Sequence, residues 1–464
     1  MSNSPRLFTL LFSVLLLAAV TGTTAQTAKP LIAGPMPGNM GMRTATVWVE
    51  ADASVKKLTI RYHPENNKSA ARKMEYAGEL GKEFNPVKFE LNGLELNTTY
   101  RYSIWADGTE LKIPYPTTFT TNDLWQYRKP APDFSFLTGS CAYFNEPAFD
   151  RPGKPYGGDS SIFETMAATP AAFHVWLGDN WYTREVDYES PWGLNYRASR
   201  DRSQPVLQRF LASMPQYAIW DDHDYGPNDH NKSYIHKEAS RRIFSSYTCN
   251  PSYGENGKGI YTKISHSDVD IFLTDDRYFR SAPELPDSIE NRPNSQKTFF
   301  GKEQMEWLKN ALLQSKATFK IIAVGSQVLN PYNQFECFRQ YASEYRDLMD
   351  FLQTQAIPGV LFFSGDRHHS EVIRTERPGT YPLFDVTISP YTSGVARVKG
   401  AELNNPFRME GTLVEAQNFG KVSITGKKKE RKLQVDFLGI RGEVLASWSV
   451  GEQELKNVQG KKEE

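Results

Sequence analysis

The chain has few cysteines, and it lacks the closely spaced pairs that hold structural zinc. Only Cys141, Cys249 and Cys337 occur among its 464 residues, so no Cys-x₂-Cys motif exists and zinc fingers are excluded. An oxidising compartment favours pairing two of the three thiols. We expect a disulfide between Cys249 and Cys337, which leaves Cys141 as a thiol that needs an explanation.

Signatures of several common enzyme and binding classes are also missing. The chain has no Gly-x-Ser-x-Gly elbow of serine hydrolases and no Gly-x₄-Gly-Lys-Ser/Thr loop of nucleotide-triphosphate hydrolases. Lys and Arg together number 54, and so do Asp and Glu, which gives no net charge. Nucleic-acid binding usually needs a basic excess, so no nucleic-acid partner is indicated.

Long apolar runs are absent except near the N-terminus. Residues 7–20 (LFTLLFSVLLLAAV) follow Arg6, and Thr23 and Ala25 supply small residues for cleavage. The run is shorter than the ~20 residues that a membrane span needs. Residues 1–25 are therefore expected to be a signal peptide. Because no Arg-Arg pair precedes the run, we expect the general secretion route and a secreted or periplasmic protein with no stable membrane anchor after cleavage.

Two domains follow, and the first is a small β-sandwich over residues 30–122. Short β-rich segments at 44–50, 57–62 and 100–106 are separated by turn signals such as Asn92-Gly93 and Asp107-Gly108. The stretch from Leu94 to Tyr100 resembles the corner of fibronectin type III or immunoglobulin-like modules, in which a tyrosine pins a strand crossover. Nothing in this domain suggests chemistry, so we expect it to be a spacer or a cap.

The second domain, residues 132–450, is expected to be α/β, after a linker at 122–132. Short apolar runs alternate with helical patterns at 160–168 and 301–316, as in strands buried on both faces of a layered fold. The charge run at 427–432 indicates a solvated hairpin between strands at 421–425 and 432–437. Residues 451–464 are expected to form a disordered tail.

Polar residues, many of them of types that bind metal ions, follow nearly every apolar strand of the second domain. The segments that directly follow these strands are Gly139-Ser140-Cys141, Gly178-Asp179-Asn180-Trp181-Tyr182, Asp221-Asp222-His223-Asp224, Asp275-Asp276-Arg277, Gly325-Ser326-Gln327 and Ser364-Gly365-Asp366-Arg367-His368-His369. In α/β sheets ligands bind outside the carboxyl ends of the strands. A single Asp in such a place is usually a turn residue or a helix cap, but six strand ends of this kind favour a shared site.

A metal site explains the crowding of acids best. Asp221, Asp222, Asp224 and Asp229 fall within nine residues, and such carboxylates ionise together only in a solvated loop or beside cations. Carboxylates suit Ca²⁺, Mg²⁺ or Mn²⁺, whereas a thiolate with a phenolate suits ferric iron. Two unlike metals therefore fit better than one zinc ion.

These segments, in this order, resemble the PhoD-like alkaline phosphatases, a branch of the calcineurin-like metallophosphoesterases. The resemblance covers roughly residues 30–450, and Trp220 to Gly226 with Asn228-Asp229 is among its most specific parts. It implies a layered metallophosphoesterase β-sandwich flanked by helices, with an N-terminal fibronectin- or Ig-like sandwich domain. It also implies a phosphoric ester hydrolase, acting on small-molecule or polymeric phosphate esters, whose metal-activated hydroxide attacks phosphorus.

The resemblance assigns roles residue by residue. Asp179 is the implied bridging carboxylate, and Cys141, Tyr182 and His368 complete a ferric site. Asp222 and Asp366 hold one or two Ca²⁺ ions, with Asn228 or Asp229 as helpers; Mg²⁺, Mn²⁺ or Zn²⁺ are the alternative ions.

Two further residues are candidates for catalysis. His223 is the expected proton donor to the leaving oxygen. Arg277 either steadies transition-state charge or forms an ion pair with Asp275 or Asp276. His369 is assigned a supporting or substrate-side role.

The leading hypothesis is an exported alkaline phosphatase or phosphodiesterase. The preference between monoester and diester stays open, because loops such as 281–297 are expected to set the shape of the pocket. The alternative is a non-enzymatic extracellular binding protein with a degenerate metallophosphoesterase domain. The complete set of candidate ligands argues against that alternative.

Overall fold

The computed structural model describes residues 29–457. The expected signal peptide, residues 1–25, lies outside the described residues. Within them, no helix combines the length and the apolar character that crossing a membrane would require.

The N-terminal part of the chain is an all-β sandwich, as its alternating sequence predicted. One sheet contains β1 (Leu31–Gly38), β2 (Thr44–Ala51) and β5 (Asn85–Asn92). The other contains β4 (Arg72–Glu75), β3 (Leu58–Pro64), β6 (Thr99–Ala106), β7 (Thr109–Glu110) and β8 (Thr118–Thr120). The Tyr100 hydroxyl accepts a hydrogen bond from the Glu95 amide at 2.9 Å, which confirms the tyrosine corner expected from the sequence.

The larger part is a mixed α/β core built on two six-stranded sheets. The first sheet has the order β11 (Gln216–Ile219), β10 (His174–Leu177), β9 (Phe134–Gly139), β20 (Asn418–Thr425), β21 (Lys432–Gly439), β22 (Val444–Gly451). The second has the order β12 (Thr262–His266), β13 (Val269–Leu273), β16 (Phe319–Val324), β17 (Val360–Ser364), β19 (Leu383–Thr387), β18 (Glu371–Thr375). The sheets face each other across one apolar core, where Phe136 of β9 meets Phe363 of β17.

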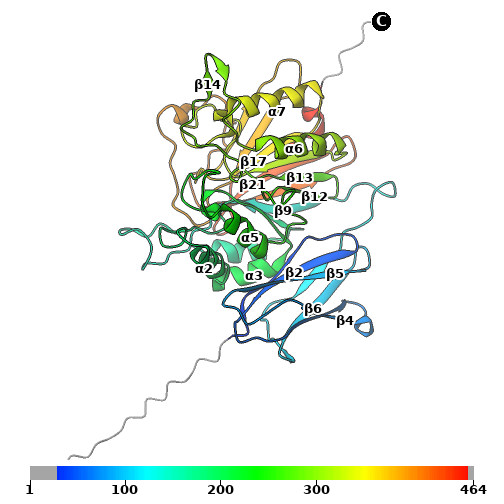
Figure 1. Cartoon of the computed structure of the whole chain (residues 1–464). Coiled ribbons are helices and arrows are strands. Elements are labelled where there is room, and N and C mark those ends of the chain that lie inside the picture. The colour runs from blue at the N-terminus through cyan, green and yellow to red at the C-terminus, as the bar shows by residue number, and fades with distance from the viewer. Residues whose placement is uncertain (1–28, 458–464) are drawn as a thin grey trace, which may run out of the picture.

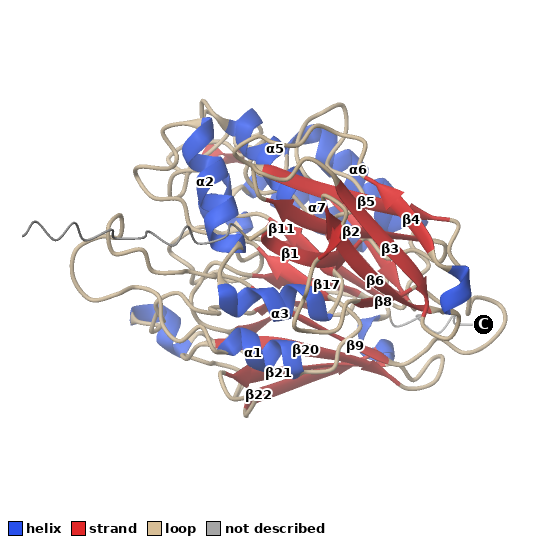
Figure 2. Cartoon of the chain, turned by 90° about the horizontal axis from the view of Figure 1, so that it is seen from below, coloured by secondary structure: helices blue, strands red, loops and turns tan. Residues whose placement is uncertain are grey.

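Helices cover the outer faces of both sheets. On the first sheet lie α1 (Ile162–Ala168) and α3 (Pro205–Ser213), with α2 (Pro191–Arg202) and α5 (Lys237–Tyr247) beside them (Figure 2). On the second sheet lie α6 (Gly301–Gln314) and α7 (Ala342–Thr354) (Figure 1). The rings of Phe163 in α1, Trp176 in β10 and Phe210 in α3 pack together, which fixes this helix layer.

The sandwich docks on the helices of the core through specific polar contacts. The indole of Trp48 donates to the Ser246 carbonyl at 2.8 Å, and the Tyr247 hydroxyl donates to Glu50 at 2.6 Å. Ala33, Met36 and Trp48 also join the apolar cluster of the core. Figure 1 shows the sandwich below α3 and α5, at the end of the molecule away from α6 and α7.

The minor elements complete the chain. They are η1 (Lys68–Ala70), the short helix α4 (Asp222–Tyr225), the hairpin of β14 (Ser288–Ile289) and β15 (Arg292–Pro293), η2 (Phe338–Gln340), η3 (Gly400–Asn404) and η4 (Glu452–Leu455).

Three expectations from the sequence are wrong. The tail does not begin at residue 451, because η4 follows β22 and buries the Leu455 side chain. Cys249 and Cys337 are free and buried; Cys249 packs beneath Gly38 of the sandwich, whereas Cys337 lies at η2. The hairpin at 427–432 is not solvated throughout, since Arg431 is buried and bonds both Asp268 oxygens at 2.8 and 3.0 Å.

Candidate metal centre

The strand ends that the sequence singled out meet at one edge of the two sheets. The loops after β9, β10, β11 and β17 bring Cys141, Asp179, Asp222, Asp366 and their neighbours to a cavity of about 820 Å³. This edge is the carboxyl end of parallel strands, where α/β proteins bind ligands. Asp179, Asp222, His223, Asp366 and His368 line that cavity, and Cys141 and Tyr182 lie buried behind it.

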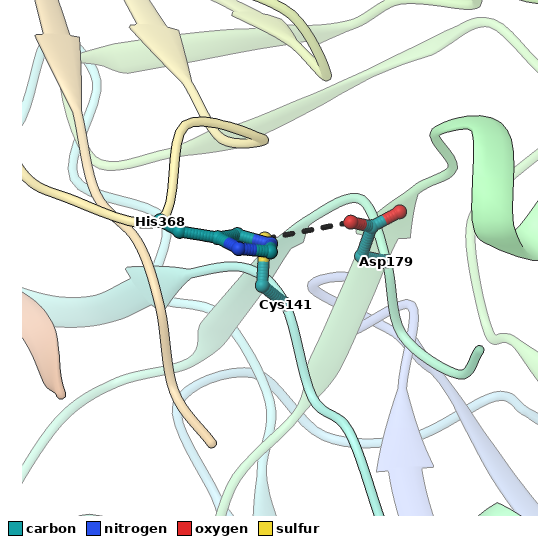
Figure 3. Close-up of side chains that lie close together, drawn as sticks. All are labelled: Cys141, Asp179 and His368. Atoms are coloured by element: carbon teal, nitrogen blue, oxygen red, sulfur yellow. Dashed lines mark hydrogen bonds between the residues drawn. The ribbon is translucent and has the colours of Figure 1, made fainter. Parts of the chain in front are cut away.

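One set of side chains gathers around a single oxygen of Asp179. Asp179 Oδ2 lies 3.4 Å from Cys141 Sγ and accepts a hydrogen bond from the Tyr182 hydroxyl at 2.8 Å. The Tyr182 oxygen is also 3.1 Å from His368 Nε2. Figure 3 shows His368, Cys141 and Asp179 converging from three loops. The Cys141, Asp179 and His368 donor atoms lie within 4.8 Å of one another, a spacing that one metal ion can span.

A second set of side chains shares Asp179 with the first. Donor atoms of Asp179, Asp222 and His223 lie within 4.8 Å of one another, and so do those of Asp222, Asp229 and Glu336. Asp179 therefore belongs to both sets, the position expected of a bridging carboxylate. Asn228 and Asp366 line the same cavity.

The backbone aims these side chains at a conformational cost. Cys141, Asp179, Asp366 and His368 all have positive φ, between 51° and 68°, which residues other than glycine rarely adopt. Such strain persists only where the surrounding structure enforces it, and it concentrates at functional sites.

Burial and mutual repulsion shape the electrostatics of the cluster. Burial first, and then the charges of Asp222, Asp224 and Asp366, raise the pKa of Asp179 well above its usual range. Burial and the Asp179 charge likewise raise the pKa of the Cys141 thiol. Burial raises the pKa of Asp366 to about 8, although the Arg367 charge opposes this shift.

The donor set fits bound cations. Asp179 Oδ1 and Asp222 Oδ1 are buried without a hydrogen-bond partner, an expensive arrangement for a carboxylate. Cations placed between the two sets would satisfy these oxygens and let the crowded acids ionise together. Sulfur, phenol and imidazole on one side and carboxylates on the other suit ions of different hardness.

Supporting residues hold several of the candidate ligands in place. The Ser389 and Ser140 hydroxyls lie 3.1 and 3.2 Å from Cys141 Sγ. The Tyr156 hydroxyl lies 2.9 Å from His368 Nδ1, so His368 Nε2 is left to face the cluster. Asp224 accepts hydrogen bonds from the Asn180 amide nitrogens at 2.8 and 2.9 Å, which ties the loop after β10 to α4.

Arg277 does not line the cavity, and its expected contact with a substrate is wrong. Its side chain is fully buried and its Nε donates to Asp221 at 2.6 Å, while its Nη atoms bind Glu336. The ion-pair alternative is therefore the one observed, with different main partners. Asp275 meets only the backbone amide of Arg277, and Asp276 lies 3.9 Å from its guanidinium.

His223 lines the cavity beside two of the candidate ligands. Its ring packs on that of Tyr182 at 4.1 Å between centroids, and its Nε2 lies 3.9 Å from Asp222. His369 also lines the cavity and is buried beside Glu371, with Nε2 3.5 Å from a carboxylate oxygen.

Sequence reasoning missed several residues that shape the cavity. Glu336, Arg367, Arg397 and Lys399 line it, together with Tyr156. Arg367 lies within the segment 364–369 that the sequence singled out, but it was given no role there. The others do not directly follow a strand, so no motif marked them. The segment 281–297 contributes no residue to this cavity, which corrects the expectation that it sets the pocket's shape. The loops around residues 332–336 and 395–402 do so.

Comparisons with known proteins agree with this architecture. The family model described as "PhoD-like phosphatase" matches residues 136–435. A solved structure of PhoD aligns at a TM-score of 0.74, with 17% identity over 94% of each chain. The purple acid phosphatase PPD1 from yellow lupin (Lupinus luteus) seeds aligns at 0.62, with 11% identity over 90% of this chain and 74% of its own. No curated protein matches the chain in sequence.

Proposed function

Because this chain belongs to the PhoD-like phosphatase family, we propose that it is an exported, metal-dependent phosphoesterase that hydrolyses phosphate monoesters or diesters at the cluster around Asp179. The observation that carries the proposal is that two sets of candidate metal ligands share Asp179. It belongs both to the set of Cys141 and His368 and to the set of Asp222 and His223, with Oδ1 buried and unpartnered.

The proposed metals are one Fe³⁺ and one or two Ca²⁺. Cys141, Tyr182 and His368 with Asp179 would hold the ferric ion, and Asp179, Asp222 and Asp366 would hold calcium, helped by Asn228 or Asp229. When bound, such a pair of cations activates the attacking water and neutralises phosphoryl charge. Export is proposed from the apolar run at residues 7–20.

The protein's own residues set the geometry of the reaction. Tyr156 fixes the ring of His368 through Nδ1, and the hydroxyls beside Cys141 support a thiolate at Sγ. His223 borders the cavity next to Asp222 and is proposed to give a ring proton to the leaving oxygen. Arg277 keeps the loops that carry Asp221 and Glu336 together.

Turnover of simple esters tests the proposal. Purified mature protein, with its metal content measured, would be assayed with aryl phosphate monoesters and diesters with and without Ca²⁺. We expect turnover of at least one class, and we expect Asp179→Asn to lose both metal and activity because the bridging charge is gone. Loaded protein that turns over neither class from neutral to alkaline pH would favour the binding-protein alternative. Normal metal content and activity in Asp179→Asn would refute the bridging role.

A further inference from the structure

A second cavity lies next to the metal centre. It measures about 310 Å³ and shares Tyr156, His223 and Asn228 with the larger cavity. Five aromatic side chains stand in its wall, and we call it the tyrosine cavity after them: Tyr143, Phe149, Tyr156, Tyr182 and Tyr188. The exposed cations Arg151 and Lys154 lie at its rim.

The tyrosine cavity has a wall fixed by internal bonds. The Asp150 carboxylate accepts hydrogen bonds from the Tyr143 hydroxyl at 2.7 Å and from Arg184 at 2.9 Å. The Arg184 guanidinium lies 4.1 Å from the centre of the Tyr143 ring, and its side chain is 4% exposed. These contacts hold the Tyr143 ring in place whether or not a ligand is bound.

A loop from 145 to 157 forms the outer side of the cavity. The side chain of Asn145 bonds the Gly157 amide at 2.9 Å and the Gly157 carbonyl at 2.8 Å, which closes the neck of the loop. Its middle extends to the left in Figure 1 and leaves Phe149 42% and Tyr156 44% exposed. Large aromatic side chains left open beside a reaction centre mark a place for a ligand.

The position of His223 decides which part of a substrate enters this cavity. Asp179 and Asp222 face the larger cavity, whereas His223 borders both cavities and packs on Tyr182. An ester with its phosphorus at Asp179 and Asp222 therefore presents the oxygen nearest His223 to the tyrosine cavity. In the proposed function this oxygen belongs to the leaving alcohol.

The chemistry of the two cavities differs. Charged and polar side chains make up most of the lining of the larger cavity, among them Asp229, Glu336, Arg367, Lys399 and Glu402. The tyrosine cavity has five aromatic side chains in its lining beside charged ones such as Asp150 and Glu185, and Tyr143 and Tyr156 meet edge to face at 4.9 Å. Flat rings stack favourably in such surroundings, with Arg151 and Lys154 near enough to attract an anionic substituent.

Resting on the proposed phosphoesterase activity, we propose that the tyrosine cavity binds the leaving alcohol and selects alcohols that carry a planar ring, such as nucleosides. Phe149, at the exposed mouth, is a residue that determines this specificity. It touches none of the candidate metal ligands through a hydrogen bond, so its removal leaves the reaction centre intact.

Two esters of the same primary alcohol type test the inference: a nucleoside 5′-phosphate and glycerol 3-phosphate, or their methyl diesters if the enzyme accepts only diesters. Both leaving groups are primary alcohols, so a difference in kcat/KM between the two esters measures the effect of the planar ring. We expect the nucleoside ester to be preferred and Phe149→Ala to lower its kcat/KM by about 5- to 150-fold, the usual range for losing a base-stacking aromatic. Glycerol phosphate should be unaffected.

Two variants serve as controls. Phe149→Tyr keeps a ring and should retain the preference. Phe335→Ala removes an aromatic side chain that is 67% exposed in the larger cavity and should leave the ratio of the two kcat/KM values unchanged. Equal kcat/KM for both esters, or an equal loss for both in Phe149→Ala, would overturn the inference while leaving the phosphoesterase activity in place. Turnover of no ester of any kind would reject the inference and the proposed function together.

Discussion

Individual backbone conformations carry much of the information about this site. Cys141, Asp179 and Asp366 lie far apart in the sequence, yet each adopts a left-handed conformation two residues after a strand ends. His368 adopts it too, in the same loop as Asp366. In that conformation the chain turns sharply, so the side chain points toward the sheet edge rather than along the strand. The strain costs of order 1–3 kcal/mol at each position, which the packed core has to offset.

The proposed ligation of ferric iron by Cys141 and Tyr182 predicts a coloured protein. A thiolate and a phenolate are electron-rich donors and ferric iron is a good acceptor, so direct bonding produces a broad charge-transfer band. We expect Tyr182→Phe to shift or weaken the band, and Cys141→Ser to lower iron content as well. Visible spectra and elemental analysis of the three proteins check this. A colourless, iron-free, fully active wild type would instead indicate Ca²⁺, Mg²⁺ or Mn²⁺ bound by oxygen atoms alone.

The sequence predicted the candidate ligands better than their supporting partners. Asp179 and Asp222 follow apolar runs, and strand ends converge whatever the exact topology. Glu336 carries no such signal, because its contacts with Arg277 and Arg280 depend on how a long loop folds back. Arg277 was misjudged for the same reason: a conspicuous arginine beside two acids pairs mainly with others that are distant in sequence.

At the scale of elements, Arg277 joins three connections of the core. It follows β13, bonds Asp221 at the start of α4, and bonds Glu336 in the segment after β16. Removing its charge would leave the buried Asp221 carboxylate without its partner, and Glu336 would keep only Arg280. We expect Arg277→Met to lower the free energy of unfolding by about 3–5 kcal/mol, as measured by urea denaturation of the metal-loaded protein.

An exposed ion pair provides the matched control for that variant. Arg374 pairs with Glu376 at 2.6 Å, with side chains 43% and 69% exposed. Arg374→Met should therefore change stability by less than about 1 kcal/mol. If Arg277→Met kept wild-type stability and lost only turnover, a structural role for the buried ion pairs of Arg277 would be wrong. A contact between Arg277 and the substrate would then explain the result.

Strands were easier to predict than the connections between them. The runs at 269–273 and 319–324 coincide with β13 and β16, because buried strands read as unbroken apolar segments. Residue 431 shows the limit of such reasoning. The neighbours of Arg431 are exposed, but Asp133 and Asp268, from other parts of the chain, pair with its side chain. The local charge run therefore predicted a solvated residue where the structure has a buried one.

At the scale of the whole molecule, a buried acid lies where the sandwich meets the core. Glu50 of β2 is 1% exposed and accepts a hydrogen bond from Tyr247 of α5, while its Oε2 has no partner. Burial raises the pKa of Glu50 from 4.5 to about 7, against the opposing hydrogen bonds of Tyr247 and Ser199. The protonated acid is therefore the form that the docked arrangement favours.

This shift predicts how stability depends on pH. Between pH 4.5 and about 7 the folded state holds a proton on Glu50 that the unfolded state has released, so this contribution to stability is lost as pH rises through that window. Glu50→Gln removes the ionisation. The free energies of unfolding of this variant and of wild type should be nearly equal below pH 4.5. The advantage of the variant should grow to at most about 3 kcal/mol by pH 8. Thermal unfolding at several pH values measures the difference.

Glu90→Gln, at an exposed position on β5 of the same sandwich, is the control and should give a difference that does not change with pH. If the difference for Glu50→Gln were also independent of pH, the pKa of Glu50 would be the same in the folded and unfolded states. Water would then reach this carboxylate where the sandwich meets the core.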